Sequence, residues 1–240
     1  MANSRVIGAS VASAIPVEAI DGKITLVYWD ICGLAQPIRL ALACAGVEFV
    51  DVRIDAGHPP SDSYKQVWFD RKPDVAAAGC LFTNLPYLID GNLKIAQSNA
   101  ILLHVGRKFN LLGDNPVGVD LALAQGTDLD NALTGTCYRE AFNLEPLLQS
   151  RLKLDEWAAM LGAKPFMTGD TLTVADLKIY ETFRKIKIAA GHCNLTSPFD
   201  KHPTLSAFID RVEAHPPVAA YQKSPAYRAR PLNNPHAQFR

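Results

Sequence analysis

A two-residue turn, Asp90-Gly91, separates two short apolar segments, residues 86–89 and 93–96. Asp-Gly between such segments is a strong signal for a tight β-hairpin, because glycine readily adopts the positive φ that the turn requires. The pattern therefore predicts two adjacent antiparallel strands. Ser98, which follows directly, can cap a helix that ends near Asn110. This part of the chain is thus predicted to fold as strand, strand, helix.

The preceding segment predicts a strand, helix, strand unit. Residues 24–29 are β-branched or aromatic and alternate between two faces, which is typical of a strand. Pro37 suits the first turn of a helix, and Gly46 can supply the left-handed cap at its end. A second strand is expected at residues 48–54 and a short helical piece at residues 63–69. The order up to about residue 108 is therefore βαβ followed by ββα.

A cluster of glycine, proline and asparagine at residues 111–118 indicates a linker, and the chain after it reads as helical. Thr173 and Asp176 have the spacing of a capping box at the start of one helix. We therefore expect five segments. They are a disordered N-terminal extension at 1–22, a βαβ-ββα domain at 23–108, a linker at 109–118, a helical domain at 119–224 and an irregular tail at 225–240.

Composition excludes several classes of function. The 240 residues include 24 Lys plus Arg and 24 Asp plus Glu, so no net charge favours nucleic acid or a membrane surface. The five cysteines are widely spaced without a CxxC pair, which favours reduced thiols in the cytoplasm over disulfides or a metal site. No apolar run is long enough to span a membrane. The first 20 residues carry Arg5 and no acid before Glu18, a weak feature of targeting peptides.

Residues 28–34, Tyr-Trp-Asp-Ile-Cys-Gly-Leu, place two reactive groups at one site, between a strand and a helix. A Tyr28 hydroxyl could stabilise a ligand's sulfur as thiolate by hydrogen bonding. Cys32, in the turn before a helix, could itself be a nucleophile, because helix N-termini lower the pKa of thiols. The residues of this turn alone leave both chemistries open.

Several blocks in this order resemble cytosolic glutathione S-transferases, most closely the mu class. The resemblance covers about residue 23 to residue 224. It rests on residues 28–34, Trp68 with Lys72, residues 84–91, residues 97–102, and Asp128 with Cys137-Tyr138. It implies an α+β fold, in which a thioredoxin-like βαβ-ββα domain precedes an all-α helical bundle. It also implies glutathione as co-substrate, no other cofactor, and detoxification of xenobiotic compounds.

The resemblance also implies a glutathione site, with Tyr28 as the catalytic residue. Asn84-Leu85-Pro86 matches a turn with a cis peptide bond before proline, whose exposed backbone edge can pair with an extended tripeptide. The first turn of the helix at Ser98 suits a carboxylate. Family mu enzymes have arginine where Lys65 aligns, and lysine lacks the bidentate fork. The implied glutathione-binding residues are Tyr28, Trp29, Leu34, Lys65, Trp68, Lys72, Asn84, Leu85, Pro86, Gln97, Ser98 and Asp128.

A homodimer is implied as well, with Asp128 reaching the neighbouring subunit's site and Phe82 acting as an aromatic wedge in the partner. Leu103 stands where mu enzymes usually have an interface arginine. The second substrate would be a hydrophobic electrophile such as an aryl halide, an enone or an epoxide. Its implied binding residues are Ile31, Leu34, Thr127, Thr134 and Tyr138. The tail after Pro231 lacks a clear aromatic wall, so it predicts no substrate range.

Two alternatives remain. Cys32 replaces an arginine of mu enzymes and aligns with the catalytic cysteine of omega-class relatives, which predicts thiol transferase or dehydroascorbate-reductase-like activity. The other alternative is a non-catalytic protein, either a ligandin-type binder of hydrophobic compounds or a signalling partner. Retention of Tyr28, Lys72, Gln97 and Ser98 favours glutathione binding in either case.

Overall fold

The computed structural model describes residues 2–240, which divide into two compact units. One unit contains the chain up to Val105 together with Ala220–His236 and Arg240. The other contains Gly106–Ala219 together with Ala237–Phe239. The mixed sheet in the first unit and the helices in the second confirm the predicted α+β fold.

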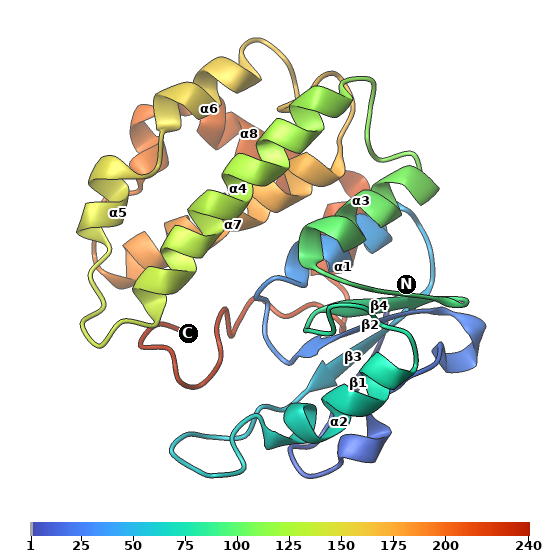
Figure 1. Cartoon of the computed structure of the whole chain (residues 1–240). Coiled ribbons are helices and arrows are strands. Elements are labelled where there is room, and N and C mark those ends of the chain that lie inside the picture. The colour runs from blue at the N-terminus through green and yellow to red at the C-terminus, as the bar shows by residue number, and fades with distance from the viewer. Residues whose placement is uncertain (1) are drawn as a thin grey trace. The chain divides into compact units, whose positions relative to one another are not determined.

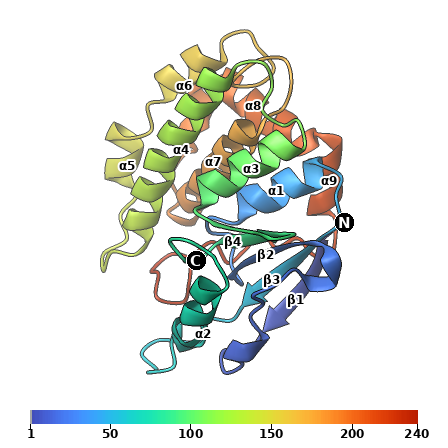
Figure 2. The ribbon, with the colours of Figure 1, turned by 45° about the vertical axis from the view of Figure 1, so that its right-hand side comes forward.

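The first unit is built on a five-stranded sheet with the strand order β1-β3-β2-β4-β5. The first three strands in this order are parallel, and β4 and β5 are antiparallel to their neighbours. Helices α1 and α3 lie on one face of the sheet and α2 lies on the other (Figures 1 and 2). The elements are β1 (Ala2–Ile7), β2 (Ile24–Trp29), α1 (Gln36–Cys44), β3 (Phe49–Ile54), α2 (Gln66–Ala77), β4 (Tyr87–Asp90), β5 (Leu93–Ala96) and α3 (Ser98–Lys108).

Several local predictions for this unit are confirmed. Asp90 pairs with Leu93 across the hairpin, and Gly91 has a φ of 58°. The Leu85-Pro86 peptide bond is cis. The predicted short helical piece at residues 63–69 was wrong in extent, because α2 continues to Ala77 with Pro73 inside it. Its buried residues Val67, Trp68 and Val75 show that packing, rather than propensity, sustains the helix.

The N-terminal extension, for which disorder was expected over residues 1–22, contains strand β1 from Ala2 onward. Strand β1 pairs in parallel with β3, from Ala2 opposite Phe49 to Ile7 opposite Ile54. Because Asn3, Ser4 and Arg5 interrupt β1 and Ile7 is its one buried residue, its own sequence is a weak strand signal, and pairing with a buried neighbour determines its structure.

Side chains of the first unit hold the residues after β1. Arg71 donates to the Ile15 carbonyl at 2.9 Å, and the Tyr87 hydroxyl donates to the Pro16 carbonyl at 2.5 Å. The Ile15 side chain is fully buried. The segment is therefore an integral part of this unit.

The second unit contains the remaining helices, except that the last residues of α9, from Ala220, belong to the first unit. The longest helices of the second unit, α4 and α7, lie side by side (Figure 1). Gly126 allows this close approach, because a Cβ there would lie 2.6 Å from Ile179. The elements are α4 (Pro116–Cys137), α5 (Glu145–Ser150), α6 (Leu154–Leu161), α7 (Val174–His192), α8 (Pro203–Ala214) and α9 (Pro216–Gln222), with short 3₁₀ turns at Ala12–Ala14, Ile20–Gly22 and Pro198–Lys201 along the chain.

Two polar features stabilise this unit. The predicted capping box is present, with the Thr173 backbone N–H donating to the Asp176 carboxylate at 2.8 Å. Asp130 on α4 accepts from Lys178 at 2.8 Å and from Lys185 at 3.0 Å, both on α7. Burial works to raise the pKa of Asp130, but the two lysines outweigh it and hold that pKa below its usual range.

The boundaries of the linker and of the C-terminal tail differ from those that the sequence indicated. Helix α4 begins at Pro116, inside the predicted linker, with the Asn115 side chain accepting from the Gly118 N–H at 2.9 Å. Most of the tail after residue 225 belongs to the first unit. Within the described part of the chain, no helix is both long and apolar enough to cross a membrane.

We predict that deleting residues 2–16 lowers the thermal midpoint of unfolding by several degrees. The deletion removes strand β1 and the buried Ile15, whose burial alone is worth about 2 kcal/mol. For a chain of this size, 1 kcal/mol corresponds to about 2–4 °C. Differential scanning calorimetry measures the shift.

The matched control is Arg5→Ala, which removes only an exposed ion pair with Asp21. Such pairs contribute less than about 1 kcal/mol, so this midpoint should change little. An unchanged midpoint for the deletion would contradict the pairing of β1 with β3.

Candidate active site

The sheet register brings three predicted site segments together. Strand β4 pairs antiparallel with both neighbours, so that Tyr87 lies between Val27 of β2 and Ala96 of β5. Continuing this register by one residue places Pro86, just before β4, between Tyr28 of β2 and Gln97, just after β5. These predicted site residues therefore meet at one end of the sheet.

Tyr28 is the second-last residue of β2, and its side chain is almost fully buried. Its hydroxyl oxygen accepts a hydrogen bond from the Leu34 N–H at 3.2 Å. Gly33 makes this contact possible, because a Cβ there would lie only 2.6 Å from the Tyr28 oxygen. Gly33 also has a φ of 45°, which suits glycine. Because Gly33 has no side chain, the Tyr28 hydroxyl can lie next to the backbone of the turn.

Cys32 lies in the same turn but is fully buried. Its thiol donates to the carbonyls of Arg228 and Ala229, with Sγ to oxygen distances of 3.2 and 3.5 Å. The C-terminal tail also accepts from two N–H groups of the turn, from Cys32 to Pro231 at 2.8 Å and from Gly33 to Leu232 at 3.1 Å. The tail therefore covers Cys32, and the contacts suit a protonated thiol, since only that form can donate.

The turn before β4 contributes the next group of predicted residues. Leu85 is buried and Asn84 is exposed. The Asn84 side chain accepts from the Leu85 N–H at 2.9 Å. A peptide ligand that used the Leu85 N–H would have to displace this amide side chain, which is exposed and short enough to move.

Gln97 and Ser98 form the start of α3. Gln97 is exposed with a φ of 72°, and its carbonyl accepts the Ile101 N–H at 2.9 Å. Ser98 is half-buried and is the first residue of the helix. The backbone N–H groups of a helix's first turn have no partners within the helix, and the dipole there favours negative charge. This end of the site can therefore bind a carboxylate.

The three predicted residues around α2 occupy different environments. Trp68 is almost fully buried and stacks on Tyr87, with ring centroids 5.9 Å apart. Lys72 is half-buried one helical turn later. Lys65 precedes the helix, with its ammonium 4.9 Å from the Tyr64 ring centroid and 6.0 Å from that of Trp29. Burial lowers the pKa of Lys65. Trp68 has a packing role in the first unit in addition to the binding role implied for it.

The other predicted residues belong to α4 in the second unit. Asp128 is exposed and lines a pocket of about 630 Å³ together with Gln125, Leu129, Arg151, Lys153 and Trp157. Thr127, Thr134 and Tyr138 are half-buried; the two threonines lie on one face of α4, and Tyr138 directly follows the last residue of the helix. The Thr127 hydroxyl donates to the Leu123 carbonyl at 2.7 Å.

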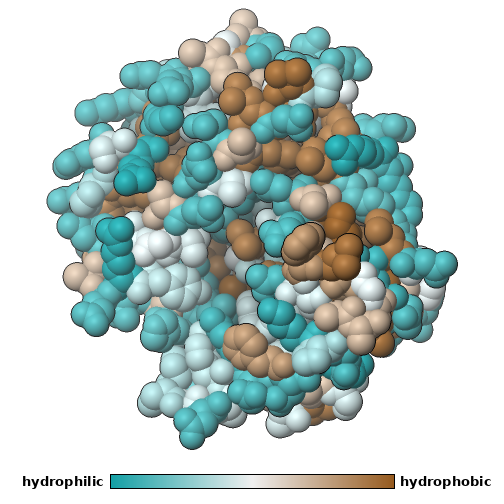
Figure 3. Space-filling model, viewed as in Figure 1, coloured by the Kyte–Doolittle hydropathy of each residue, from teal (hydrophilic) through white to brown (hydrophobic). Residues whose placement is uncertain are grey.

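Two exposed hydrophobic residues precede β4. Phe82 is 86% exposed and Leu81 is 76% exposed, and Phe82 has a φ of 50°. On the face shown in Figure 3, hydrophobic residues are interspersed with hydrophilic ones. An adjacent pair of large, exposed apolar side chains is unusual for a surface and indicates a contact site.

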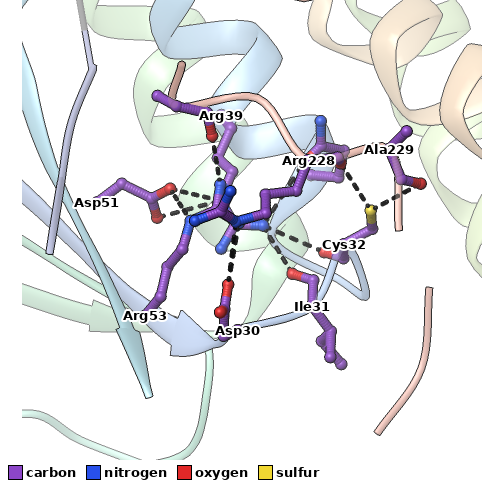
Figure 4. Close-up of polar contacts among 10 residues, drawn as sticks. Asp30, Ile31, Cys32, Arg39, Asp51, Arg53, Arg228 and Ala229 are labelled. Carbon is purple, nitrogen blue, oxygen red and sulfur yellow. Dashed lines mark hydrogen bonds and ion pairs between the residues drawn. The ribbon is translucent and has the colours of Figure 1, made fainter. Parts of the chain in front are cut away.

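The sequence analysis missed a buried ionic cluster beneath the Tyr28 turn, formed by Arg39, Asp51 and Arg53 (Figure 4). A signal was present, because Asp51 and Arg53 alternate with Val50, Val52 and Ile54 in a predicted strand. Charges on one face of a strand are usually solvated, and only the fold shows that helix α1 and the tail cover this face. Among residues 2–240, no three His, Cys, Asp or Glu side chains are grouped to bind a metal.

Two domains of one known protein family match this chain. Residues 24–107 match the glutathione S-transferase N-terminal domain, and residues 128–225 match the glutathione S-transferase C-terminal domain.

Individual proteins are similar over most of the chain. Human glutathione S-transferase Mu 4 is 35% identical over 88% of this chain and 95% of its own length. A glutathione S-transferase from Tyrophagus putrescentiae is 34% identical over 92% of this chain and 98% of its own. The solved structure of the Onchocerca volvulus Pi-class glutathione S-transferase covers 90% of this chain and all of its own, with a TM-score of 0.75 and 29% identity.

We predict that Gly33→Ala displaces the Tyr28 ring and lowers the thermal midpoint by several degrees. The new Cβ would lie 2.5 Å from Cε1 of Tyr28, and relieving such overlap costs about 1–3 kcal/mol. Gly135→Ala on α4 is the control, because nothing lies within 4 Å of its Cβ position. Alanine should be neutral or slightly stabilising there. Equal midpoints for Gly33→Ala and wild type would show that Tyr28 does not occupy this position.

Proposed function

The chain belongs to the glutathione S-transferase family and is an enzyme of that class, and we propose that Tyr28 is the residue that activates glutathione in it. The Tyr28 hydroxyl would donate a hydrogen bond to the glutathione sulfur and so stabilise the thiolate. The thiolate would then attack a hydrophobic electrophile such as an aryl halide, an enone or an epoxide. Detoxification in the cytoplasm is the role that this chemistry suits.

The observation that carries the proposal is the hydrogen bond from the Leu34 N–H to the Tyr28 oxygen. In this bond the phenol oxygen is the acceptor, and a hydroxyl that accepts one hydrogen bond becomes a stronger donor of its own proton. A free cysteine thiol has a pKa of about 8.5 and is only slightly ionised at neutral pH. Lowering it to about 6.5 requires about 2.7 kcal/mol, which one strong hydrogen bond and the dipole of α1 can supply together.

The meeting of β2, β4 and α3 supports binding of the glutathione tripeptide next to Tyr28. The γ-glutamyl carboxylate would lie at Gln97 and Ser98, where the first turn of α3 offers N–H groups. The cysteine residue would pair with the backbone of Leu85. Lys65, Trp68 and Lys72 would hold the glycine carboxylate, with further contacts from Trp29, Leu34, Asn84 and Pro86.

The electrophile would bind next to the Tyr28 turn. Half-buried Leu34 and buried Ile31 would supply apolar contacts there. Thr127 and Thr134 share a face of α4, Tyr138 directly follows that helix, and the Tyr138 hydroxyl could donate to an oxygen that gains negative charge during the reaction.

A homodimer would complete the site. Asp128 is exposed in its pocket and would reach the γ-glutamyl ammonium bound to the other subunit. Phe82 would insert into the partner as a wedge, which accounts for its exposure. The pocket beside Asp128 includes the Trp157 and Leu129 side chains, so it offers apolar as well as polar contacts.

The Cys32 alternative has less support. The thiol is buried under the tail and donates to two backbone carbonyls, which stabilise the protonated form. A nucleophilic cysteine needs access to its substrate and an environment that favours the thiolate. Tyr28 therefore remains the proposed catalytic residue.

We predict that Tyr28→Phe loses at least about 90% of kcat/KM for conjugation of a chloronitrobenzene and raises the pKa of bound glutathione. The change removes only the hydroxyl that donates to sulfur. Titrating the ultraviolet absorbance of the thiolate in the complex measures that pKa.

Cys32→Ser is the matched control, since serine can donate to the same two carbonyls and conjugation should persist. Loss of activity in Cys32→Ser with retention in Tyr28→Phe, in conjugation and mixed-disulfide reduction assays, would reverse the assignment.

We also predict that Phe82→Ser shifts the protein from dimer to monomer and weakens glutathione binding. Analytical ultracentrifugation and binding to immobilised glutathione measure the two effects. Phe69→Ser is the control, because Phe69 is 55% exposed on α2 and has no proposed interface role. If both variants sediment like wild type, Phe82 is not an interface residue.

A further inference from the structure

The buried ionic cluster lies directly beneath the proposed catalytic turn. The Arg39 Nε lies 3.0 Å from both carboxylate oxygens of Asp51, and the Arg53 Nε lies 2.8 Å from one of them. All three side chains are fully buried. Two guanidinium groups share one carboxylate, so their remaining donors need other acceptors in the interior.

Those acceptors belong to the turn and to the C-terminal tail (Figure 4). Arg39 donates to the Ile31 carbonyl at 2.8 Å. Arg53 donates to the Asp30 carboxylate at 3.3 Å and to the Ala226 carbonyl at 2.9 Å. Arg53 thus contacts β3, the turn and the tail with a single side chain.

The part of the tail that crosses the turn, residues 226–232, is called the strap here. Its carbonyls accept from the Cys32 N–H, the Gly33 N–H and the Cys32 thiol. The Arg228 guanidinium also lies 3.9 Å from the Asp30 carboxylate. The N–H after these two belongs to Leu34, and it donates to the Tyr28 oxygen. The strap therefore accepts hydrogen bonds from the two N–H groups that immediately precede the Leu34 N–H, which contacts Tyr28.

We propose that Arg53 is a positioning residue, which fastens the strap to the turn and thereby aims the Leu34 N–H at the Tyr28 hydroxyl. The inference rests on the proposed function of Tyr28. Tyr28 and Arg53 are partners in the parallel pairing of β2 with β3, so both side chains lie on the same face of the sheet. Arg53 does not contact the sulfur, and it acts through the turn and the strap.

An arginine is required because three acceptors surround it in different directions. The planar guanidinium has five N–H donors, which can reach Asp51, Asp30 and the Ala226 carbonyl at once. A lysine ammonium is compact and cannot span all three. Arg53→Lys should therefore keep the charge near Asp51 and lose the connection between turn and strap.

Alkylation of Cys32 in the native protein tests the fastening directly. The thiol is buried under the strap, so its rate of reaction with iodoacetamide reports release of the strap. In Arg53→Lys we expect Cys32 to react at least tenfold faster than in wild type, as measured by mass spectrometry of its peptide. Cys80 and Cys137 are also buried and serve as internal controls, whose rates should not change. Bound glutathione in Arg53→Lys should also have a higher thiol pKa.

Two further variants separate positioning from general stability. Lys178→Met removes one ion pair from buried Asp130 in the second unit, so it should leave Cys32 labelling and the glutathione pKa unchanged. Asp30→Asn removes the negative charge that Arg53 contacts in the turn, at a side chain that is only partly buried. Asp30→Asn should raise the rate of Cys32 labelling several-fold. If Arg53→Lys does not fold, this variant tests the proposal in its place.

The proposal is overturned if Cys32 reacts at the wild-type rate in both Arg53→Lys and Asp30→Asn. It is equally overturned if Cys32, Cys80 and Cys137 all accelerate together in Asp30→Asn, because that pattern means global unfolding rather than release of the strap. If the wild-type protein does not lower the pKa of bound glutathione, the proposed role of Tyr28 fails. The labelling rates then still report on the fastening of the strap, so the two failures are distinguishable.

Discussion

A single buried carboxylate, Asp51, holds four parts of the first unit in place. It binds Arg39 of α1 and Arg53 of its own strand, and these two arginines then hold the Ile31 carbonyl of the turn and the Ala226 carbonyl of the tail. Burial works to lower the pKa of Arg39, but the charge and hydrogen bond of Asp51, together with Tyr221 and Cys32, outweigh it, and the pKa is raised. Removing Asp51 would leave buried Arg39 without a counterion and Arg53 with Asp30 alone, and breaking a buried ion pair typically costs about 3–5 kcal/mol.

The structure assigns different environments to the two reactive groups of the turn. The Tyr28 oxygen accepts from a backbone N–H, and Gly33 leaves the space that the ring needs. The Cys32 thiol points at the carbonyls of the tail. In the proposed mechanism the Tyr28 hydroxyl donates to the glutathione sulfur, whereas the Cys32 thiol is covered and hydrogen-bonded to the tail. These two environments support the proposal that Tyr28 is the catalytic residue, although the turn before α1 also contains Cys32.

Features with local causes could be predicted from the sequence. The Asp90-Gly91 hairpin and the Thr173 capping box depend on neighbouring residues, and both are present. Strand β1 could not be predicted, because its order comes from pairing with β3. Asp51 and Arg53 were missed for a similar reason, since their partners lie on α1, the turn and the tail. In the candidate site, family motifs predicted roles for Tyr28 and Ser98, but no motif indicated the strap.

The most direct test of the account is a crystal structure of the protein with glutathione bound. The account predicts that the glutathione sulfur lies within about 3.5 Å of the Tyr28 hydroxyl oxygen, close to hydrogen-bond distance for sulfur. Cys32 should remain beneath residues 226–232, with its thiol on the Arg228 and Ala229 carbonyls. A sulfur that faces or is bonded to Cys32, with the tail displaced and Tyr28 out of reach, would contradict the central claim.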